Sequence, residues 1–266
     1  MTDWLAAVLL GIIEGLTEFL PISSTGHLLI AQRWLPAQSE LFDVVLQSGA
    51  VLAVVVVFSK RLKEMFLSWR EPKNFDYLIK LAFAFAVTGA GGLALKYKGL
   101  TFPKEIAPIA WTTLIGGIVI LGLEYGMRNK KSAGEITWLV ALTVGAAQIL
   151  AAACPGTSRS GASILFAMVV GLSRPAATEF SFLVGIPTMF AAGGYEIYHT
   201  LKHADPGAQP ERWDLVFIGT LVSALVAFVV VKWLLRYVQS HTFTGFGWYR
   251  IAVGAALLAL VFHHVV

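Results

Sequence analysis

The chain has 266 residues, of which 57% are hydrophobic and only 14% are charged. Its mean hydropathy is +0.72. Because several apolar runs reach the roughly 20 residues that cross a bilayer, this composition excludes a soluble globular protein and predicts an integral membrane protein. The pI near 9.2 arises from basic segments beside the apolar runs, and these segments lack the pattern of a nucleic-acid site.

The apolar runs predict an all-α polytopic membrane protein with two kinds of helix. Six runs are long enough for full crossings, and we expect these at residues 42–58, 77–95, 106–125, 176–197, 215–235 and 248–263. Four other runs are too short or too polar to cross alone, and they form two broken pairs, 4–20 with 27–35 and 136–154 with 162–172. The segments 60–76 and 199–212 are expected to be polar loops.

The first broken pair combines two acids with a break rich in hydroxyl groups. Glu14 and Glu18 share a helix face, where carboxylates are costly unless they bind a cation, share a proton or pair with an arginine. Ser23 and Ser24 lie in the break, and His27 opens the following helix. Either Ser24 or His27 can attack phosphorus while the other residue or Glu18 moves the proton, and a divalent cation on the glutamates would bridge a diphosphate.

The second broken pair meets at the stretch Pro155-Gly156-Thr157-Ser158-Arg159-Ser160-Gly161-Ala162-Ser163. An unpaired guanidinium near membrane depth costs about 3 kcal/mol, which favours a functional role for Arg159. Hydroxyl groups, backbone N–H groups and the fork of an arginine together fit a phosphate. The residues expected to bind this phosphate with Arg159 are Ser23, Gly156, Thr157, Ser158, Ser160 and Ser163.

Other readings of this stretch fit less well. The spacing from Gly156 to Gly161 is that of a nucleotide-binding P-loop, but Ala162 stands where the lysine belongs. Cys154 and Arg159 are one residue too close for a cysteine-phosphatase loop. Inverted halves around an anion site also describe transporters and lipid flippases, but these need no nucleophile and base.

The two broken pairs resemble one unit used twice. A shift by about half the chain aligns Gly11 with Gly145, Pro21 with Pro155 and Ser24 with Ser158, and it places Glu14 opposite Gln148. We therefore expect one membrane domain, 1–266, made of repeat halves at about 1–132 and 133–266. Each half is a re-entrant helical hairpin followed by three crossings, an odd number that inverts the second half relative to the first.

Charge placement predicts the orientation of these halves. In this topology both termini and the 199–212 loop share one side with six basic residues. The opposite, cytoplasmic side collects thirteen. The six are Arg33, Lys96, Lys98, Lys104, Lys202 and Arg212, and the thirteen are Lys60, Arg61, Lys63, Arg70, Lys73, Lys80, Arg128, Lys130, Lys131, Arg174, Lys232, Arg236 and Arg250.

Residues 14–27 and 155–163, together with Glu179-Phe180-Ser181-Phe182 and the overall length, resemble the undecaprenyl-diphosphate phosphatase family linked to bacitracin resistance. The resemblance covers essentially the whole chain. It implies hydrolysis of undecaprenyl diphosphate to the monophosphate, which recycles the lipid carrier for cell-wall synthesis in the bacterial plasma membrane. The family's site residues match Glu14, Glu18, Ser24, His27 and Arg159, while Ser163 replaces a threonine that is common in the motif.

The resemblance also implies a site open to the outer face, dependence on a divalent cation such as Mg²⁺ or Ca²⁺, and a homodimer. We favour Ser24 as nucleophile with His27 as base, and direct attack by His27 is the second choice. The expected partners are a prenyl diphosphate and membrane lipid, with no nucleic acid.

Overall fold

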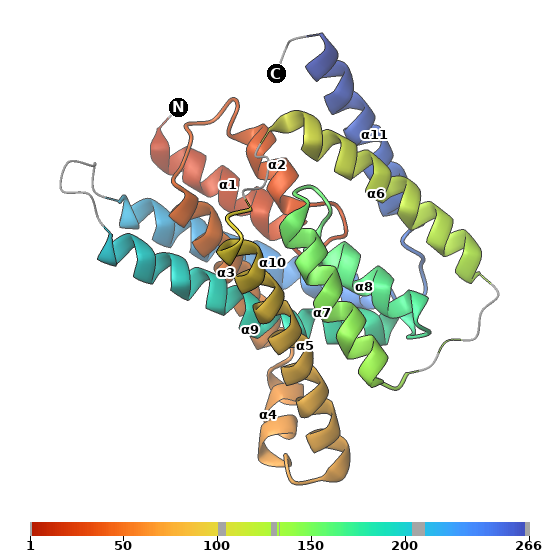
Figure 1. Cartoon of the computed structure of the whole chain (residues 1–266). Helices are drawn as coiled ribbons and strands as arrows, with labels where there is room; N and C mark the ends of the chain where they lie inside the picture. Colours follow the sequence, from red (N-terminus) through yellow and green to blue (C-terminus); the bar gives the residue numbers. More distant parts are fainter. Residues whose placement is uncertain (1, 101–104, 129–131, 133, 204–210, 264–266) are drawn as a thin grey trace.

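The computed structural model describes residues 2–100, 105–128, 132, 134–203 and 211–263, and within these residues the chain forms eleven helices and no β-strand (Figure 1). The helices are α1 Asp3–Thr17, α2 Ser24–Ala31, α3 Glu40–Val57, α4 Ser59–Leu67, α5 Pro72–Tyr97, α6 Ile106–Met127, α7 Trp138–Ala153, α8 Arg159–Val169, α9 Arg174–Lys202, α10 Trp213–Tyr237 and α11 Thr244–Phe262. The fold is all-α, as the sequence predicted.

Six of these helices are long and apolar enough to cross a membrane, namely α3, α5, α6, α9, α10 and α11. They coincide with the six predicted crossings, although α9 is longer than expected, with 29 residues. The helices of the broken pairs are shorter, from 8 residues in α2 to 16 in α7. The prediction of six helices long and apolar enough to cross a membrane is confirmed among the described residues.

The segment between the first two crossings is not the polar loop that we expected. Residues Ser59–Leu67 form α4, and α5 begins at Pro72, a residue type suited to the first turn of a helix. The segment is helical because Leu62 and Met65 are apolar at a spacing of three, and Met65 is buried. Half of the other predicted loop, 199–212, lies outside the described residues, and its first four residues, 199–202, are not a loop because they form the end of α9.

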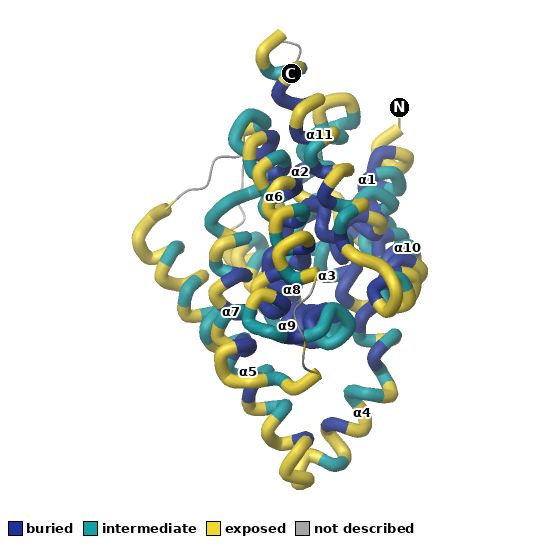
Figure 2. Tube along the Cα trace, turned by 90° about the vertical axis from the view of Figure 1, so that its right-hand side faces the viewer, coloured by how far each residue is buried: buried dark blue, intermediate teal, exposed yellow. Residues whose placement is uncertain are grey.

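The broken helices pack against crossings that are distant in sequence. Helix α1 lies against α10, and α7 lies against α5, while α3 contacts both α9 and α10, and α6 pairs with α11. Figure 2 shows buried segments gathered inside the bundle and exposed segments along α4 and α5. The largest buried cluster combines aromatic and aliphatic side chains such as Phe19, Val54, Met168, Phe180 and Leu234.

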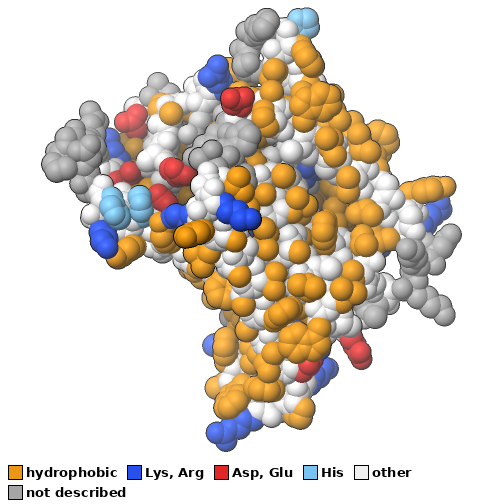
Figure 3. Space-filling model, in the orientation of Figure 1, with side chains coloured by type: hydrophobic (Ala, Val, Ile, Leu, Met, Phe, Trp, Pro, Cys, Tyr) orange, Lys and Arg blue, Asp and Glu red, His pale blue; other side chains and the backbone are white. Residues whose placement is uncertain are grey.

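The surface has the character of a membrane protein. Leucine, valine, phenylalanine and tryptophan side chains are exposed on most helices, for example Leu93, Phe217 and Val229. Figure 3 shows hydrophobic side chains over the middle of one face, with charged side chains toward its ends. Such a band of exposed apolar side chains is stable in contact with lipid and would be unfavourable in water.

Candidate active site

The first break, between α1 and α2, and the second break, between α7 and α8, meet inside the protein. Ser160 Oγ, at the start of α8, donates hydrogen bonds of 3.1 Å to the backbone carbonyls of Glu18 and Leu20. Ser158 Oγ contacts the Leu20 carbonyl at 3.4 Å. These bonds join segments from the two halves of the chain, and they satisfy carbonyl groups that the end of α1 leaves without helical partners.

Each break ends in a serine with unusual backbone geometry. Ser23 has φ +73° and Ser158 has φ +71°. Each is the N-cap of the next helix, because Ser23 Oγ accepts from Gly26 N and Ser158 Oγ accepts from Gly161 N. The caps make α2 start at Ser24 and α8 at Arg159, so the predicted starts at residues 27 and 162 were three residues late.

Gly156 shapes the second break. Its φ is +89°, in the left-handed region that favours glycine, and a Cβ atom there would lie 2.0 Å from Thr112 Oγ1. The Thr112 hydroxyl donates to the Pro155 carbonyl at 2.5 Å, which ties the break to α6. Any larger residue at position 156 would therefore push the break away from α6.

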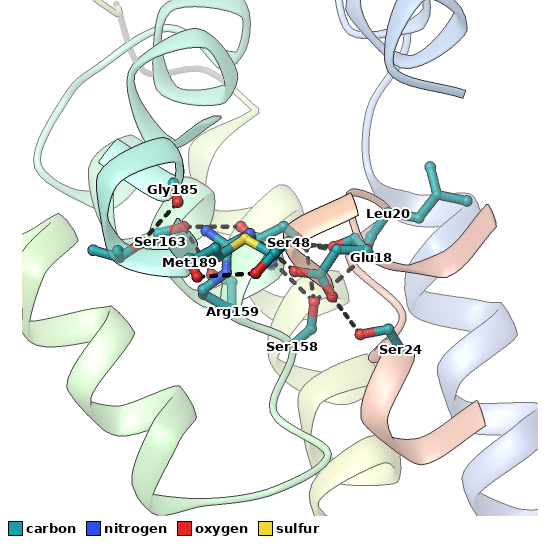
Figure 4. Close-up of polar contacts among 12 residues, drawn as sticks. Glu18, Leu20, Ser24, Ser48, Ser158, Arg159, Ser163, Gly185 and Met189 are labelled. Atoms are coloured by element: carbon teal, nitrogen blue, oxygen red, sulfur yellow. Dashed lines mark hydrogen bonds and ion pairs between the residues drawn. The ribbon is translucent and has the colours of Figure 1, made fainter. Parts of the chain in front are cut away.

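Glu18 connects the two breaks through its side chain (Figure 4). Its Oε2 accepts a 2.5 Å hydrogen bond from Ser24 Oγ, and its Oε1 accepts from Arg159 Nη2 at 3.0 Å. The Glu18 side chain is only 6% exposed. The structure thus places a hydroxyl group, a proton acceptor and a guanidinium in one chain of contacts, with each group supplied by a different short segment.

These three side chains line a cavity of about 350 Å³. Its other walls come from α3, α5, α7 and α9. Among the predicted site residues, those that line it are Glu18, Ser23, Ser24, Gly156, Ser158 and Arg159. Apart from its Nη2 bond to Glu18, the Arg159 guanidinium has no acceptor among the described residues, so Nε and Nη1 face no competing protein oxygen.

Three predicted phosphate-binding residues lie outside this wall. The Ser160 hydroxyl donates to a carbonyl of the first break, and Ser163 Oγ donates to the Arg159 carbonyl at 2.7 Å. Thr157 Oγ1 donates to the Cys154 carbonyl at 2.6 Å. In this structure the three hydroxyl groups hold the second break and the first turn of α8 in shape.

His27 is also separate from the Glu18 chain of contacts. Its Nδ1 lies 2.7 Å from the Ser23 carbonyl, so Nδ1 carries the proton, because a carbonyl only accepts. Its Nε2 lies 2.7 Å from the Tyr249 hydroxyl, and the two rings stack at 5.8 Å. The partner of Ser24 in this structure is Glu18, and His27 supports the strained Ser23.

On α1 and α7, two buried polar side chains have no hydrogen-bond partner among the described residues. They are Glu14, with both carboxylate oxygens unpartnered, and Gln148, with both amide atoms unpartnered. Glu14 is fully buried and does not line the cavity. No group of three or more His, Cys, Asp or Glu side chains placed to hold a metal ion occurs in the described part of the chain.

Sequence reasoning misassigned Arg250, which we counted as a cytoplasmic flanking charge. Its side chain is 1% exposed on α11, and its guanidinium donates to five backbone carbonyls. Two belong to the second break, one to the first break and two to α6, namely Gly156, Thr157, Pro21, Thr112 and Thr113. An arginine within a predicted crossing was the signal that could have revealed this role.

The fold and the site together define a multi-pass membrane protein with an internal cavity in which a serine hydroxyl, its proton acceptor and an arginine lie side by side. An arginine with open donors suits an anion, and a serine bonded to a carboxylate suits nucleophilic attack.

Comparison with known proteins gives the family. The family model "Bacitracin resistance protein BacA" matches residues 7–256, so the chain belongs to that family. A relative named undecaprenyl-diphosphatase from Rhizobium etli (strain CIAT 652) is 52% identical over 259 residues, covering 97% of each chain. Another of that name from Xanthomonas campestris pv. campestris (strain 8004) is 48% identical, covering 97% of this chain and 98% of its own.

Proposed function

We propose that this protein hydrolyses undecaprenyl diphosphate to undecaprenyl phosphate and inorganic phosphate. The observation that carries the proposal is the bridge that Glu18 makes between Ser24 and Arg159 at the cavity wall. The names of the full-length relatives support the choice of substrate. Phosphoryl transfer depends mainly on positioning and charge neutralisation, and these groups supply both.

In the mechanism that we now favour, Ser24 Oγ attacks the terminal phosphorus while its proton moves to Glu18 Oε2. Glu18 replaces His27, the base that we expected from the sequence, because Ser24 is bonded to Glu18. The bond from phosphorus to the bridging oxygen breaks, and undecaprenyl phosphate leaves. Arg159 donates hydrogen bonds to the terminal phosphate oxygens, which carry the negative charge in the transition state. Water then attacks the phosphoserine, inorganic phosphate leaves, and the proton returns to Ser24.

Direct attack by His27 is the second candidate mechanism. It requires His27 Nε2 to exchange its Tyr249 partner for the substrate. Rapid quenching of turnover with a substrate labelled at the terminal phosphate distinguishes the two. Acid-stable phosphoserine at position 24 is expected, whereas acid-labile phosphohistidine at position 27 would replace the Ser24 mechanism.

We propose that Glu14, together with Glu18, would hold a divalent cation. The residues fit this role because the buried Glu14 oxygens have no hydrogen-bond partner in the described part of the chain, and Mg²⁺ typically takes one or two carboxylates plus water and phosphate oxygens. Such a cation supplies neutralisation of phosphate charge. The residues themselves keep the carboxylates together and exclude bulk water from them.

We also propose that the broken pairs are re-entrant hairpins of an inverted repeat. Ser23 and Ser158 are both N-cap residues with positive φ, so they occupy equivalent places in the two breaks. The sequence alignment that pairs Pro21 with Pro155 differs from this match by one residue, because it pairs Ser158 with Ser24. The packing repeats as well, because Gly11 of α1 meets Gly219 of α10 and Gly145 of α7 meets Ala84 of α5. A Cβ atom added to Gly11 would lie 2.6 Å from the Gly219 carbonyl oxygen, and one added to Gly145 would lie 2.8 Å from the Ala84 carbonyl oxygen.

We propose an orientation in which both termini and the mouth of the cavity lie on the outer face of the membrane. There the protein would recycle the lipid carrier of cell-wall synthesis. We also propose that it works as a homodimer. Figure 1 supports the placement of the two termini on one side, since both lie at one end of the molecule and α4 lies at the other. The basic residues Lys60, Arg61 and Lys63 belong to α4, which suits a cytoplasmic end even after Arg250 is removed from the count. Lys104, Lys130 and Lys131 lie outside the described residues.

The test is phosphate release from undecaprenyl diphosphate by protein purified in detergent, with Ser24→Ala as the inactive control. A transporter or flippase would show no turnover there, because detergent abolishes any gradient. Phosphate release by the wild type at a rate far above Ser24→Ala is expected. Equal background rates for both proteins would refute the proposal.

A further inference from the structure

Helix α7 presents one face to the cavity that contains Arg159. Gln148, Ala151, Ala152 and Pro155 all line this cavity, and their spacing of three and four residues places them on one side of the helix and its extension. The two alanines leave space beside the larger Gln148 side chain. This face therefore combines room for a ligand with a single polar group.

The amide of Gln148 is buried, and no residue that the structure describes is its hydrogen-bond partner. The residue is 3% exposed, and neither Nε2 nor Oε1 has a hydrogen-bond partner among the described residues. An unpartnered buried amide destabilises a protein, so an apolar residue of the same size would be the more stable choice here. A ligand in the cavity would remove this penalty by accepting hydrogen bonds from Nε2.

The charges in the cavity indicate what that ligand accepts. The lining carboxylate of Glu18 is already paired with Arg159, so the two charges offset one another. A diphosphate brings several acceptor oxygens and more negative charge than one arginine neutralises. A carboxamide can donate two hydrogen bonds to these oxygens without adding the repulsion of a second carboxylate.

The position that corresponds to Gln148 in the first half sharpens this argument. The alignment of the two halves that pairs Pro21 with Pro155 also pairs Glu14 with Gln148, and both are buried without described partners. Glu14 only accepts hydrogen bonds when it is ionised, and it does not line the cavity. The member of the pair that bears hydrogen-bond donors, Gln148, is thus the one that lines the cavity.

We propose that Gln148 is a substrate-binding residue whose amide donates hydrogen bonds to the diphosphate oxygens. The proposal rests on the proposed function for its substrate, but the recognised chemistry is that of any diphosphate in this cavity. Gln47 of α3 lines the same cavity, and no described side chain or carbonyl bonds its amide, so it is the candidate second donor.

The decisive variant is Gln148→Met, which keeps the size of the side chain and removes both polar atoms of the amide. We expect the KM for undecaprenyl diphosphate in detergent and the Kd for inorganic pyrophosphate to rise about tenfold, the size of one lost hydrogen bond to a charged group. We expect kcat to stay within about threefold, and the heat-inactivation midpoint to stay equal or rise, because a buried unpartnered amide is gone. Gln148→Glu should weaken pyrophosphate binding further, since it adds a repelling charge.

Ser181→Ala is the matched control, because Ser181 Oγ is also buried without a described partner but does not line the cavity. It should leave KM and Kd unchanged. A Gln148→Met protein with KM and Kd within twofold of wild type, or one that loses heat stability and activity together, would overturn the proposal. Pyrophosphate binding is measured without turnover, so a wild type that binds pyrophosphate but releases no phosphate would sink the phosphatase proposal and leave this one standing.

Discussion

Replacing Arg159 with lysine keeps the positive charge but removes the fork of the guanidinium. In the structure Nη2 is bonded to Glu18 Oε1 at 3.0 Å, which leaves Nε and Nη1 for phosphate oxygens. A lysine ammonium is a single point of charge and does not reproduce a planar contact with both the carboxylate and a phosphate. The variant therefore loses one or two charge-assisted hydrogen bonds in the transition state.

The size of the effect follows from those bonds. Each is worth about 1.5–3 kcal/mol, so we expect Arg159→Lys to lose about 3 kcal/mol, or roughly 150-fold in kcat/KM. The assay is release of inorganic phosphate from undecaprenyl diphosphate in detergent. Arg212→Lys is the control, because Arg212 is exposed and pairs only with Asp3 and Asp214 at the surface, among the described residues. Activity of Arg159→Lys within threefold of the control would refute the role of the fork.

Three further predictions concern groups around the cavity. Glu14→Gln should raise the heat-inactivation midpoint, because it neutralises a carboxylate that is buried without a described partner. The same variant should weaken the response of activity to added Mg²⁺, and an unchanged Mg²⁺ titration would exclude Glu14 as a ligand. Arg250→Met leaves five carbonyls without their donor, so we expect a loss of about 3 kcal/mol and a midpoint lower by roughly 10 °C, whereas Arg212→Met should change it little. Tyr249→Phe removes the hydroxyl that contacts His27 Nε2, and an approximately fivefold loss of kcat/KM is expected from one neutral hydrogen bond; wild-type activity would show that this contact does not position His27.

The crossings could be predicted from the sequence because the bilayer imposes a length on them. A run of about 20 apolar residues has few alternatives to a membrane helix, and all six predicted runs became helices of that kind. Helix α4 escaped prediction because its polar residues resemble a loop and only Met65 is buried. Its residues follow the pattern of a short amphipathic helix. This pattern is a weaker signal in the sequence than the long apolar runs on either side.

The candidate site could be predicted in part. The motifs indicated Glu18, Ser24 and Arg159, and the structure brings these three together. The positive φ values of Ser23 and Ser158 could not be predicted, because non-glycine residues rarely adopt them, and only contacts between the two breaks make such strain tolerable.

Polar networks that depend on distant parts of the chain were missed for a related reason. In the sequence, Arg250 resembles a basic residue that flanks a membrane helix. Its five hydrogen-bond acceptors are backbone carbonyls, and no particular residue type in the sequence reveals such acceptors. Gln148 has the opposite problem. Its amide makes no hydrogen bond within the described residues that a pattern could reveal, and the role that we propose for it rests on its place in the cavity wall.

If the two halves are an inverted repeat, as we propose, the positions of Ser24 and Arg159 explain how one scaffold used twice can give a single site. Each is the first residue of a short helix, and each follows a serine N-cap with positive φ. Equivalent backbone frames therefore present a hydroxyl group from one half and a guanidinium from the other. Two copies of either group would fail, because paired guanidinium groups repel each other and paired serines would leave phosphate charge without a partner. Glu18 is the link that a symmetric pair lacks, since it accepts from both residues at once and makes the two halves depend on each other.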